Sequence, residues 1–431
     1  MSPPLLKAQM IRKALVILML VLGWGTAPAA ADNSVIDYGA DPGGVTDSTS
    51  AFNSAIRAHL GGTVSVPCGK YKVSSVNFSG VSLRGGGVWC TSIIGSSATS
   101  NVLYTSNSMG NSGASDFTVD RSVTATAGAG ILIGHNTTAV IERVTSQNQW
   151  QGFYLGAATW SFCNRCIAQN NYSDGFFLTD RTPAITMQWQ MDNCLSQLNN
   201  GYGVNIFLNS TDGNETGPHF RGLNTYANTS GGLNIGGNGS SNINDLIIEG
   251  SIFAGDGNLG IHIANPGSSI VIANVFQELA GVVPTGRGLS TAASKVGHGL
   301  LLDSGGNSQR GSVQVANSTF SQNSQTGITL ASSSVLPRLE LTGNTVWGNG
   351  WHGSGALAAG IFLQSSATNT SIFGGAAFDG GARRQSYGLY MTTSAVQSRT
   401  IAAGVNFNGN VSGGCNTVIS GGKAAVLGSG C

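Results

Sequence analysis

A short phrase, glycine followed by apolar, variable and apolar residues, recurs along most of this 431-residue chain and constrains its fold more than any other feature. Each occurrence predicts a strand that is too short to bury a hydrophobic face alone, so a stack of similar coils is needed to form a core. Most occurrences lie roughly 22 to 29 residues apart, which is the length of one solenoid turn. The phrase begins at Gly130, Gly152, Gly175, Gly203, Gly232, Gly260, Gly299, Gly327, Gly360 and Gly388.

A second column of residues keeps register with the first. Asn and Gly dominate it, and both tolerate left-handed backbone angles, so the column predicts a sharp bend before the third strand of each coil. The two longest intervals between glycine phrases, from Gly260 to Gly299 and from Gly327 to Gly360, predict inserted loops. The bend column reads Arg143, Arg165, Asn193, Gly222, Gly250, Asn274, Asn317 and Gly343.

Composition excludes several classes of protein. Hydrophobic residues make up 41% of the chain and alternate with polar ones, which argues against disorder. The 64 glycines have no collagen period. The formal net charge is +1, so neither nucleic acid nor a membrane surface is predicted as a partner.

The N-terminus predicts export. Lys7, Arg12 and Lys13 precede an apolar run, 14–24, that is too short to cross a bilayer. Three alanines at 29–31 suit a signal-peptide cleavage site, so we predict cleavage after Ala31 and a secreted or periplasmic mature protein.

The region after the cleavage site predicts a cap for the first coil. A short strand is predicted over 35–40, and Ala51, Phe52, Ala55, Ile56 and Leu60 share one face of a short helix that ends at Gly61-Gly62. Such a helix would cover the open end of the core.

These N-terminal residues resemble a known family. Residues 35–40, Thr46 to Phe52 and Gly62 to Tyr71 are similar to the first segment of pectate-lyase-like proteins, which polygalacturonases and many phage tailspikes share. The resemblance implies an all-β, right-handed parallel β-helix of ten or more coils with a short N-terminal capping helix. It also implies a polysaccharide substrate, but not a reaction, because this fold carries many chemistries.

We therefore expect a signal peptide (1–31), a cap with the first coils (32–100), a β-helix body (101–410) and a C-terminal tail (411–431). Export permits disulfides, and the Cys68–Cys90 and Cys415–Cys431 pairs are predicted as staples at the two ends. Cys166 and Cys194 fall in one column of successive coils, about 4.8 Å apart, so they are close enough for a disulfide. The pairing of Cys163, Cys166 and Cys194 stays open.

The resemblance also implies that the strand opened by the glycine phrase floors a substrate cleft. By the period of two, the second residue after each glycine points outward. Polar residues with aromatic neighbours suit a glycan groove, and an ordinary exposed strand face is the alternative. The outward column reads Tyr154, Phe177, Asn205, Asn234, His262, Leu301, Thr329, Phe362 and Tyr390. With the loops on either side, the predicted substrate-binding residues are Tyr154, Phe177, Tyr202, Asn205, Asn234, Arg287 and Lys295.

The candidate catalytic residues are His262, Asp303, His298, Asp180 and Arg181. Gly297-His298-Gly299 resembles a polygalacturonase motif, but the partner aspartates are missing from the preceding coils and Asp174 lies several coils away. Strand geometry places Asp303 roughly 8 Å from His262. Elimination needs a base and a cation or hydrogen-bond donors for the uronate carboxylate, and this set contains both.

The inventory favours a lyase acting on an acidic exopolysaccharide. A glycoside hydrolase in the same groove and a non-catalytic glycan-binding β-helix are the alternatives. No metal site is predicted, and calcium dependence, the sugar, the linkage and the oligomeric state stay open.

Overall fold

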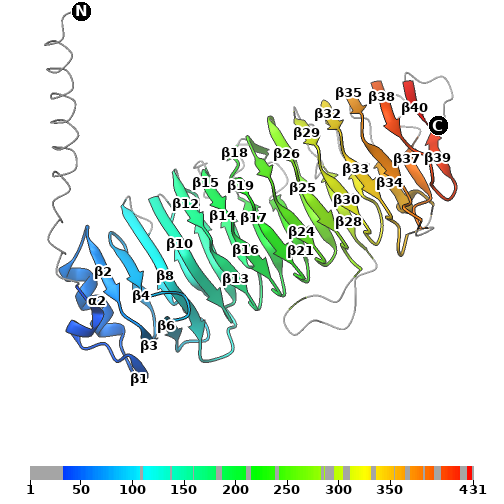
Figure 1. Ribbon diagram of the computed structural model, residues 1–431. Coiled ribbons are helices and arrows are strands. Elements are labelled where there is room, and N and C mark those ends of the chain that lie inside the picture. Colours follow the sequence, from blue (N-terminus) through cyan, green and yellow to red (C-terminus); the bar gives the residue numbers. More distant parts are fainter. Residues whose placement is uncertain are drawn as a thin grey trace, which may run out of the picture.

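The computed structural model describes residues 33–106, 110–135, 138–158, 160–180, 187–209, 215–237, 242–282, 286, 296–303, 311–331, 336–353, 355–364, 369–381, 384–392, 399–417 and 425–429. These residues form one elongated stack of coils with helix α2 (Thr49–Ala58) at its N-terminal end (Figure 1). The pairings between neighbouring strands are parallel throughout the described ranges, so this is a parallel β-helix.

Each coil contributes one strand to a first stack, which forms a 13-stranded sheet within the described ranges. The glycine phrases lie at the starts of these strands. The first stack consists of β4 (Val76–Asn77), β7 (Leu103–Tyr104), β9 (Ala129–Ile133), β11 (Gln151–Gly156), β14 (Phe176–Thr179), β17 (Tyr202–Leu208), β21 (Gly231–Gly237), β25 (Leu259–Ala264), β28 (His298–Asp303), β31 (Ile328–Leu330), β34 (Ala359–Leu363), β37 (Tyr387–Met391) and β39 (Gly413–Thr417).

The remaining strands of each coil form a second and a third stack, which the long strands β8 (Asn111–Arg121) and β10 (Thr138–Gln147) join into one sheet. The second stack also holds β2 (Thr63–Val66), β5 (Ser82–Gly85), β12 (Ser161–Asn164), β15 (Trp189–Asp192), β19 (His219–Arg221), β23 (Ile247–Glu249), β26 (Ile270–Ala273), β29 (Ser312–Ala316), β32 (Arg338–Thr342), β35 (Asn369–Phe373), β38 (Arg399–Asn406) and β40 (Ala425–Ser429). The third holds β1 (Gly43–Asp47), β3 (Gly69–Val73), β6 (Thr91–Gly95), β13 (Ile167–Gln169), β16 (Leu195–Gln197), β20 (Asn224–Tyr226), β24 (Ile252–Ala254), β27 (Phe276–Glu278), β30 (Thr319–Ser321), β33 (Thr345–Trp347) and β36 (Ala376–Phe378).

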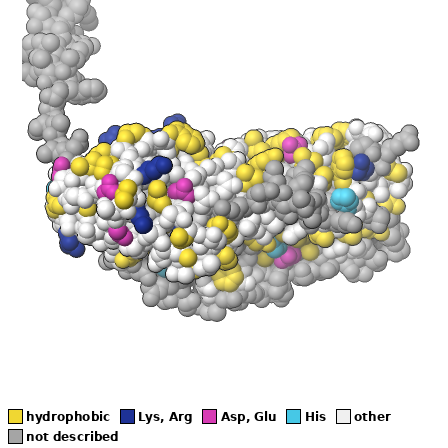
Figure 2. All heavy atoms as spheres, turned by 90° about the horizontal axis from the view of Figure 1, so that it is seen from below, with side chains coloured by type: hydrophobic (Ala, Val, Ile, Leu, Met, Phe, Trp, Pro, Cys, Tyr) yellow, Lys and Arg dark blue, Asp and Glu magenta, His cyan; other side chains and the backbone are white. Residues whose placement is uncertain are grey.

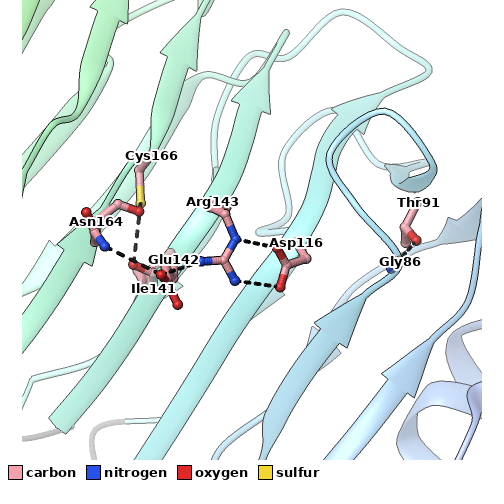
Figure 3. Close-up of polar contacts among 8 residues, drawn as sticks. All are labelled: Gly86, Thr91, Asp116, Ile141, Glu142, Arg143, Asn164 and Cys166. Carbon is pink, nitrogen blue, oxygen red and sulfur yellow. Dashed lines mark hydrogen bonds and ion pairs between the residues drawn. The ribbon is translucent and has the colours of Figure 1, made fainter.

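The bend between the second and third stacks is left-handed in every coil of the predicted column. Its φ angles lie between 49° at Arg143 and 64° at Gly343, with Asn193 at 54° and Asn274 at 53°. Arg143 and Arg165 also adopt this left-handed conformation, although arginine, unlike glycine and asparagine, does not favour it. Figure 3 shows how Arg143 is held there, with its guanidinium bonded to the carboxylate of Asp116, the bend residue of the preceding coil, at 2.5 and 2.9 Å.

The core is filled in two ways. Apolar side chains from all three stacks point inward and are almost fully buried. Beside them, a buried ladder of amides follows the coils: Asn171 Nδ2 donates to Asn199 Oδ1 at 2.8 Å, and Asn199 Nδ2 donates to Asn228 Oδ1 at 2.8 Å. The ladder ends on Asp256, whose carboxylate accepts from Asn228 Nδ2 at 2.9 Å and from Thr225 Oγ1 at 2.5 Å. Because each side chain in the ladder donates a hydrogen bond to the next, these buried polar groups have hydrogen-bonding partners.

The N-terminal cap differs from the sequence prediction in two places. Residues Val35–Tyr38 form a 3-10 helix, η1, rather than a strand, because Ser34 and Asp37 cap each other and Gly39 ends the turn at φ 88°. In α2, Ala51, Phe52, Ala55 and Ile56 are buried as predicted. Leu60 lies beyond the end of the helix and is 68% exposed.

The other end continues the stack. Strands β39 and β40 extend the first and second stacks beyond residue 410, so the segment predicted as a tail contains coil strands. A second 3-10 helix, η2 (Gly355–Ala358), lies in the interval before β34 that was predicted to hold an inserted loop. The described residues contain no helix that is long and apolar enough to cross a membrane. Residues 1–32, with the predicted signal peptide, lie outside the described ranges.

The cysteines follow the prediction at the N-terminal end. Cys68 and Cys90 form a disulfide with Cα atoms 4.7 Å apart. Cys415 is also disulfide-bonded, whereas Cys431 lies outside the described residues. Cys163, Cys166 and Cys194 are free and buried, and their thiols lie within 4.8 Å of one another. Cys166 aligns with Cys194 in the next coil and contacts the Ile141 carbonyl oxygen (Figure 3).

We expect the Cys68–Cys90 disulfide to stabilise the N-terminal cap. It closes a loop with a sequence separation of 22, for which loop-closure entropy corresponds to about 3 kcal/mol. The double variant Cys68→Ser/Cys90→Ser should unfold at a correspondingly lower denaturant concentration. Unchanged unfolding of that variant, followed by circular dichroism in urea, would contradict a stabilising role.

Candidate functional site

The outward column of the first stack has the register that the sequence predicts. Tyr154 pairs with Phe177, Phe177 with Asn205, and Asn205 with Asn234. The column continues through His262, Leu301, Thr329, Phe362 and Tyr390. Most of these side chains are partly exposed, but Thr329 and Phe362 are each only 3% exposed.

A continuous hydrogen-bonded row crosses five coils of this face. We call it the polar row, and its members are Asp174, Asn205, Asn234, His262 and Asp303. Asn205 Nδ2 donates to Asp174 Oδ2 at 3.0 Å, and Asn234 Nδ2 donates to Asn205 Oδ1 at 2.9 Å. His262 then lies between Asn234 Oδ1, 2.7 Å from Nδ1, and Asp303 Oδ2, 2.9 Å from Nε2.

Each amide nitrogen in the row donates toward Asp174, and this common direction determines which atom of Asn234 faces His262. An ionised carboxylate only accepts hydrogen bonds, so Asp174 requires the amide nitrogen of Asn205, and that in turn orients Asn234. Asn234 therefore presents its oxygen to His262, and Nδ1 must carry the proton. With the Asp303 carboxylate at Nε2 as well, both ring nitrogens face hydrogen-bond acceptors.

The contact between His262 and Asp303 is closer than the sequence predicts. The Cα register offsets Asp303 by one coil and two residues, as expected from the strand spacing. Side chains lean along a strand as well as away from it, so the two groups meet directly. The side chains of His262 and Asp303 are 16% and 26% exposed, so the pair is partly shielded from water yet accessible.

A second histidine lies beside this pair in a different environment. His298 begins β28, and its Nδ1 lies 2.6 Å from Thr326 Oγ1. Burial, together with the nearby His262, lowers the pKa of His298 to about 4. At neutral pH His298 is therefore an uncharged imidazole. Two histidines in adjacent coils thus have different surroundings, because His262 faces a carboxylate and His298 is close to a threonine hydroxyl.

Tyr202 and Asp174 close the N-terminal end of the row. The Tyr202 backbone N–H donates to Asp174 Oδ1 at 2.8 Å. Burial raises the pKa of the Asp174 carboxyl, while its hydrogen bonds from Asn205 and Tyr202 oppose that rise. The pKa of Tyr202 is raised by burial and by the Asp174 charge. Gly231 follows Tyr202 in the column, and a Cβ there would lie only 3.2 Å from the Tyr202 ring.

The other predicted site residues are placed differently. Asp180 is 2% exposed and accepts the backbone N–H of Asn209 in the next coil. Arg181, Arg287 and Lys295 lie outside the described residues. Sequence reasoning missed Asp174 and Thr326 as members of the site. Asp174 and Thr326 share one signal, because each directly precedes a glycine phrase, as His298 does.

Aromatic side chains occupy both ends of the outward column. Tyr154 and Phe177 lie N-terminal to the row, with ring centroids 5.3 Å apart. On the C-terminal side, the Tyr390 ring packs against Tyr387 at 5.3 Å and against Phe362 at 5.5 Å. Aromatic faces and directional polar groups together are what a groove for a sugar chain requires.

Loops border the column along its edges. On one edge, β18 (Glu215–Thr216) pairs with β22 (Ile243–Asn244) in a small sheet of their own. On the other, Gly286, from the predicted insertion before β28, donates its N–H to the Ala227 carbonyl oxygen at 2.6 Å. Gly286 thus contacts an earlier coil.

Charged side chains are sparse on much of the surface. On the face shown in Figure 2 they lie mainly toward the N-terminal end. An anionic ligand would therefore depend on local groups rather than on a strong field of the whole protein.

The geometry limits the reactions that the row can perform. Asp174 and Asp303 lie at its two ends, four coils apart, which corresponds to about 19 Å. Glycoside hydrolysis needs two carboxylates about 5 to 9.5 Å apart, so these two cannot act as such a pair. Within the described ranges, the three buried cysteines are the one group of metal-ligating side chains close enough to share an ion, and the polar row contains no such group.

Comparison with known proteins identifies the fold. A family model described as "Right handed beta helix region" matches residues 189–375. The A-module of mannuronan C-5 epimerase AlgE6 from Azotobacter vinelandii superposes with a TM-score of 0.58 at 18% identity, over 92% of this chain and 99% of that chain. The catalytic unit of a GH87 α-1,3-glucanase from Streptomyces thermodiastaticus does so with a TM-score of 0.56 at 17% identity, over 93% and 68%.

Tailspike protein 3 of bacteriophage CBA120 also superposes, with a TM-score of 0.62 at 13% identity, over 92% of this chain and 61% of that chain. No curated protein sequence matches this chain. The predicted right-handed parallel β-helix is thereby confirmed. At these identities the similar structures establish the fold and leave the reaction to be argued from the site.

Proposed function

We propose that this chain, a right-handed parallel β-helix of the pectate-lyase-like kind, is a polysaccharide lyase that cleaves an acidic glycan by β-elimination. The observation that carries the proposal is the polar row, in which His262 hydrogen-bonds both Asn234 and Asp303 beside the uncharged His298. Export, proposed from residues 1–31, would bring the protein to extracellular polysaccharides.

Substrate binding is assigned to the outward column. A glycan chain lying along the stack would meet the aromatic pair Tyr154 and Phe177 near one end and Tyr390 near the other. Asn205 and Asn234 direct their amides along the row between these ends. Sugars bind through such a combination of apolar ring faces and oriented polar groups.

The chemical step is assigned to the two histidines. His262, as the imidazolium held by Asp303, would lie against the uronate carboxylate and stabilise the negative charge that develops when C5 loses its proton. His298 would take that proton on Nε2, in the tautomer whose Nδ1–H donates to Thr326 Oγ1. The C5–H electron pair then forms the C4=C5 double bond. The C4–O bond breaks, and the departing oxygen takes up a proton from water.

A second candidate shares the first half of this chemistry. C5 epimerisation also begins with removal of the C5 proton but ends with its return to the opposite face. The structural likeness to an A-module named mannuronan C-5 epimerase favours including it. Hydrolysis has no support from the row, whose two carboxylates are too far apart.

The test is a panel of polysaccharides incubated with the mature protein, with calcium and with a chelator. Alginate, polygalacturonate, hyaluronan and xanthan are the acidic members, and dextran and a β-glucan are the neutral ones. We expect unsaturated products absorbing in the near ultraviolet from at least one acidic member and from neither neutral one.

Other results would contradict the proposal in different ways. New reducing ends without ultraviolet absorbance would indicate a hydrolase. Deuterium uptake at C5 from heavy water without chain cleavage would indicate an epimerase. No reaction with any member, together with retention of the protein on one of them, would support a non-catalytic glycan-binding β-helix.

A further inference from the structure

A pocket lies outside the polar row, at the N-terminal ends of three neighbouring strands of the second stack. Its cavity volume is about 150 Å³, which is smaller than that of a site for a drug-sized molecule. Its walls come from the loop before β12, from β15 and β18, and from β19, so none of the polar-row residues lines it. The lining side chains are those of Trp160, Gln188, Trp189, Gln190, Thr216 and His219.

Two indole rings give the pocket its apolar surface. Trp189 is fully buried, and its Nε1 donates to the Gly156 carbonyl oxygen at 2.9 Å, so its ring is fixed as part of the wall. Trp160 is 68% exposed. The backbone of Trp160 has φ 57°, the left-handed conformation that also forms the bends between strands elsewhere in the stack.

The remaining side chains supply hydrogen-bonding groups that are not used elsewhere. Gln188, Gln190, Thr216 and His219 are all partly exposed. Within the described ranges, none of these four side chains has a hydrogen-bonding partner. Gln190 and His219 occupy paired positions of neighbouring strands, so they lie side by side at about 4.8 Å.

The charges around the pocket define the class of ligand. No Asp, Glu, Lys or Arg is among the described residues that line it. A pyranose has one apolar face and several hydroxyl groups, which match the Trp160 ring and the two glutamine amides. We propose that this pocket is a second carbohydrate site that binds a neutral pyranose unit. It goes beyond the proposed reaction, because it would hold a glycan that the polar row does not contact.

The test is saturation-transfer NMR on the full chain with six probes, the methyl α- and β-glycosides of glucose, galactose and mannose. Trp160→Ala is the diagnostic variant because an exposed indole can be removed without opening the core. Trp89→Ala is the matched control, because it removes a 91% exposed tryptophan that is distant in sequence from the pocket residues. Circular dichroism verifies that each variant is folded.

We expect saturation transfer to at least one glycoside in the wild type, a loss of about fivefold or more in Trp160→Ala, and no change in Trp89→Ala. His262→Ala should keep the signal, which separates this site from the proposed lyase groove. The proposal is overturned if none of the six probes receives saturation. It is also overturned if the signal survives in Trp160→Ala, and a signal lost in His262→Ala instead would place the sugar in the groove.

Discussion

His262→Ala lowers kcat/KM on the cleaved polysaccharide by about a hundredfold or more, and Asp303→Asn lowers it comparably. The first substitution removes the imidazolium that would stabilise the developing charge at the uronate. The second keeps the shape of the side chain but removes the negative charge 2.9 Å from Nε2, so His262 loses its charged hydrogen-bond partner. The measurement is the initial rate of unsaturated-product formation as a function of substrate concentration.

The controls separate a role in chemistry from a role in folding. Both side chains lie on the outer face, so both variants should unfold close to the wild-type midpoint. His59→Ala changes a histidine at the far N-terminal cap, where it contacts Tyr38, and should keep full activity. Full activity of His262→Ala would remove His262 from the mechanism. A large loss of stability would show that its bonds to Asn234 and Asp303 serve the fold.

Asp256→Asn makes the stability of the fold much less dependent on pH. Burial raises the pKa of the Asp256 carboxyl from 3.8 to about 7. Between these two values the folded protein binds more protons than the unfolded chain, so the free energy of unfolding falls as pH rises. The stabilisation of the protonated form is complete below pH 3.8 and lost once the pH passes 7.

The expected magnitude follows from the size of the shift. From pH 5 to pH 8 this one group lowers the free energy of unfolding by about 3 kcal/mol. Asparagine is uncharged throughout and keeps an oxygen for Asn228, while Thr225 can reverse its hydroxyl to accept. Urea unfolding at the two pH values measures the difference between wild type and variant.

A matched substitution tests the explanation. Asp245→Asn changes an exposed aspartate in the same coil and should retain the wild-type pH dependence. If Asp256→Asn shows the same fall in stability between pH 5 and pH 8 as the wild type, the buried carboxyl is not its source.

The fold was predictable because the glycine phrases and the bend residues recur along the sequence at regular intervals. The glycine phrases placed Tyr154, Asn205 and His262 on one face in the register that the strands show. The bend column was predictable because left-handed residues recur in it. The segment 35–38 was misread as a strand, since the mutual capping of Ser34 and Asp37 decides its conformation and the apolar pattern does not.

The site was less predictable because its side chains contact residues that are displaced both by one coil and along the strand. Asp174 precedes the glycine phrase of one coil and bonds to Asn205 in the next, a relation that a period of two does not reveal. The buried ladder that ends on Asp256 was missed for a different reason. Its asparagines lie in Asn- and Gly-rich stretches that are also typical of turns. Their hydrogen bonds to one another form only when the coils stack.

The uniform pairing of each coil with its neighbours has an evolutionary consequence. A coil is a self-contained module, so duplication or loss of one unit would change the reach of the outer face by about 4.8 Å and leave the geometry of every other coil unchanged. Such a chain can therefore evolve to fit longer or shorter ligands by gaining or losing coils. The residues that perform the chemistry need not change.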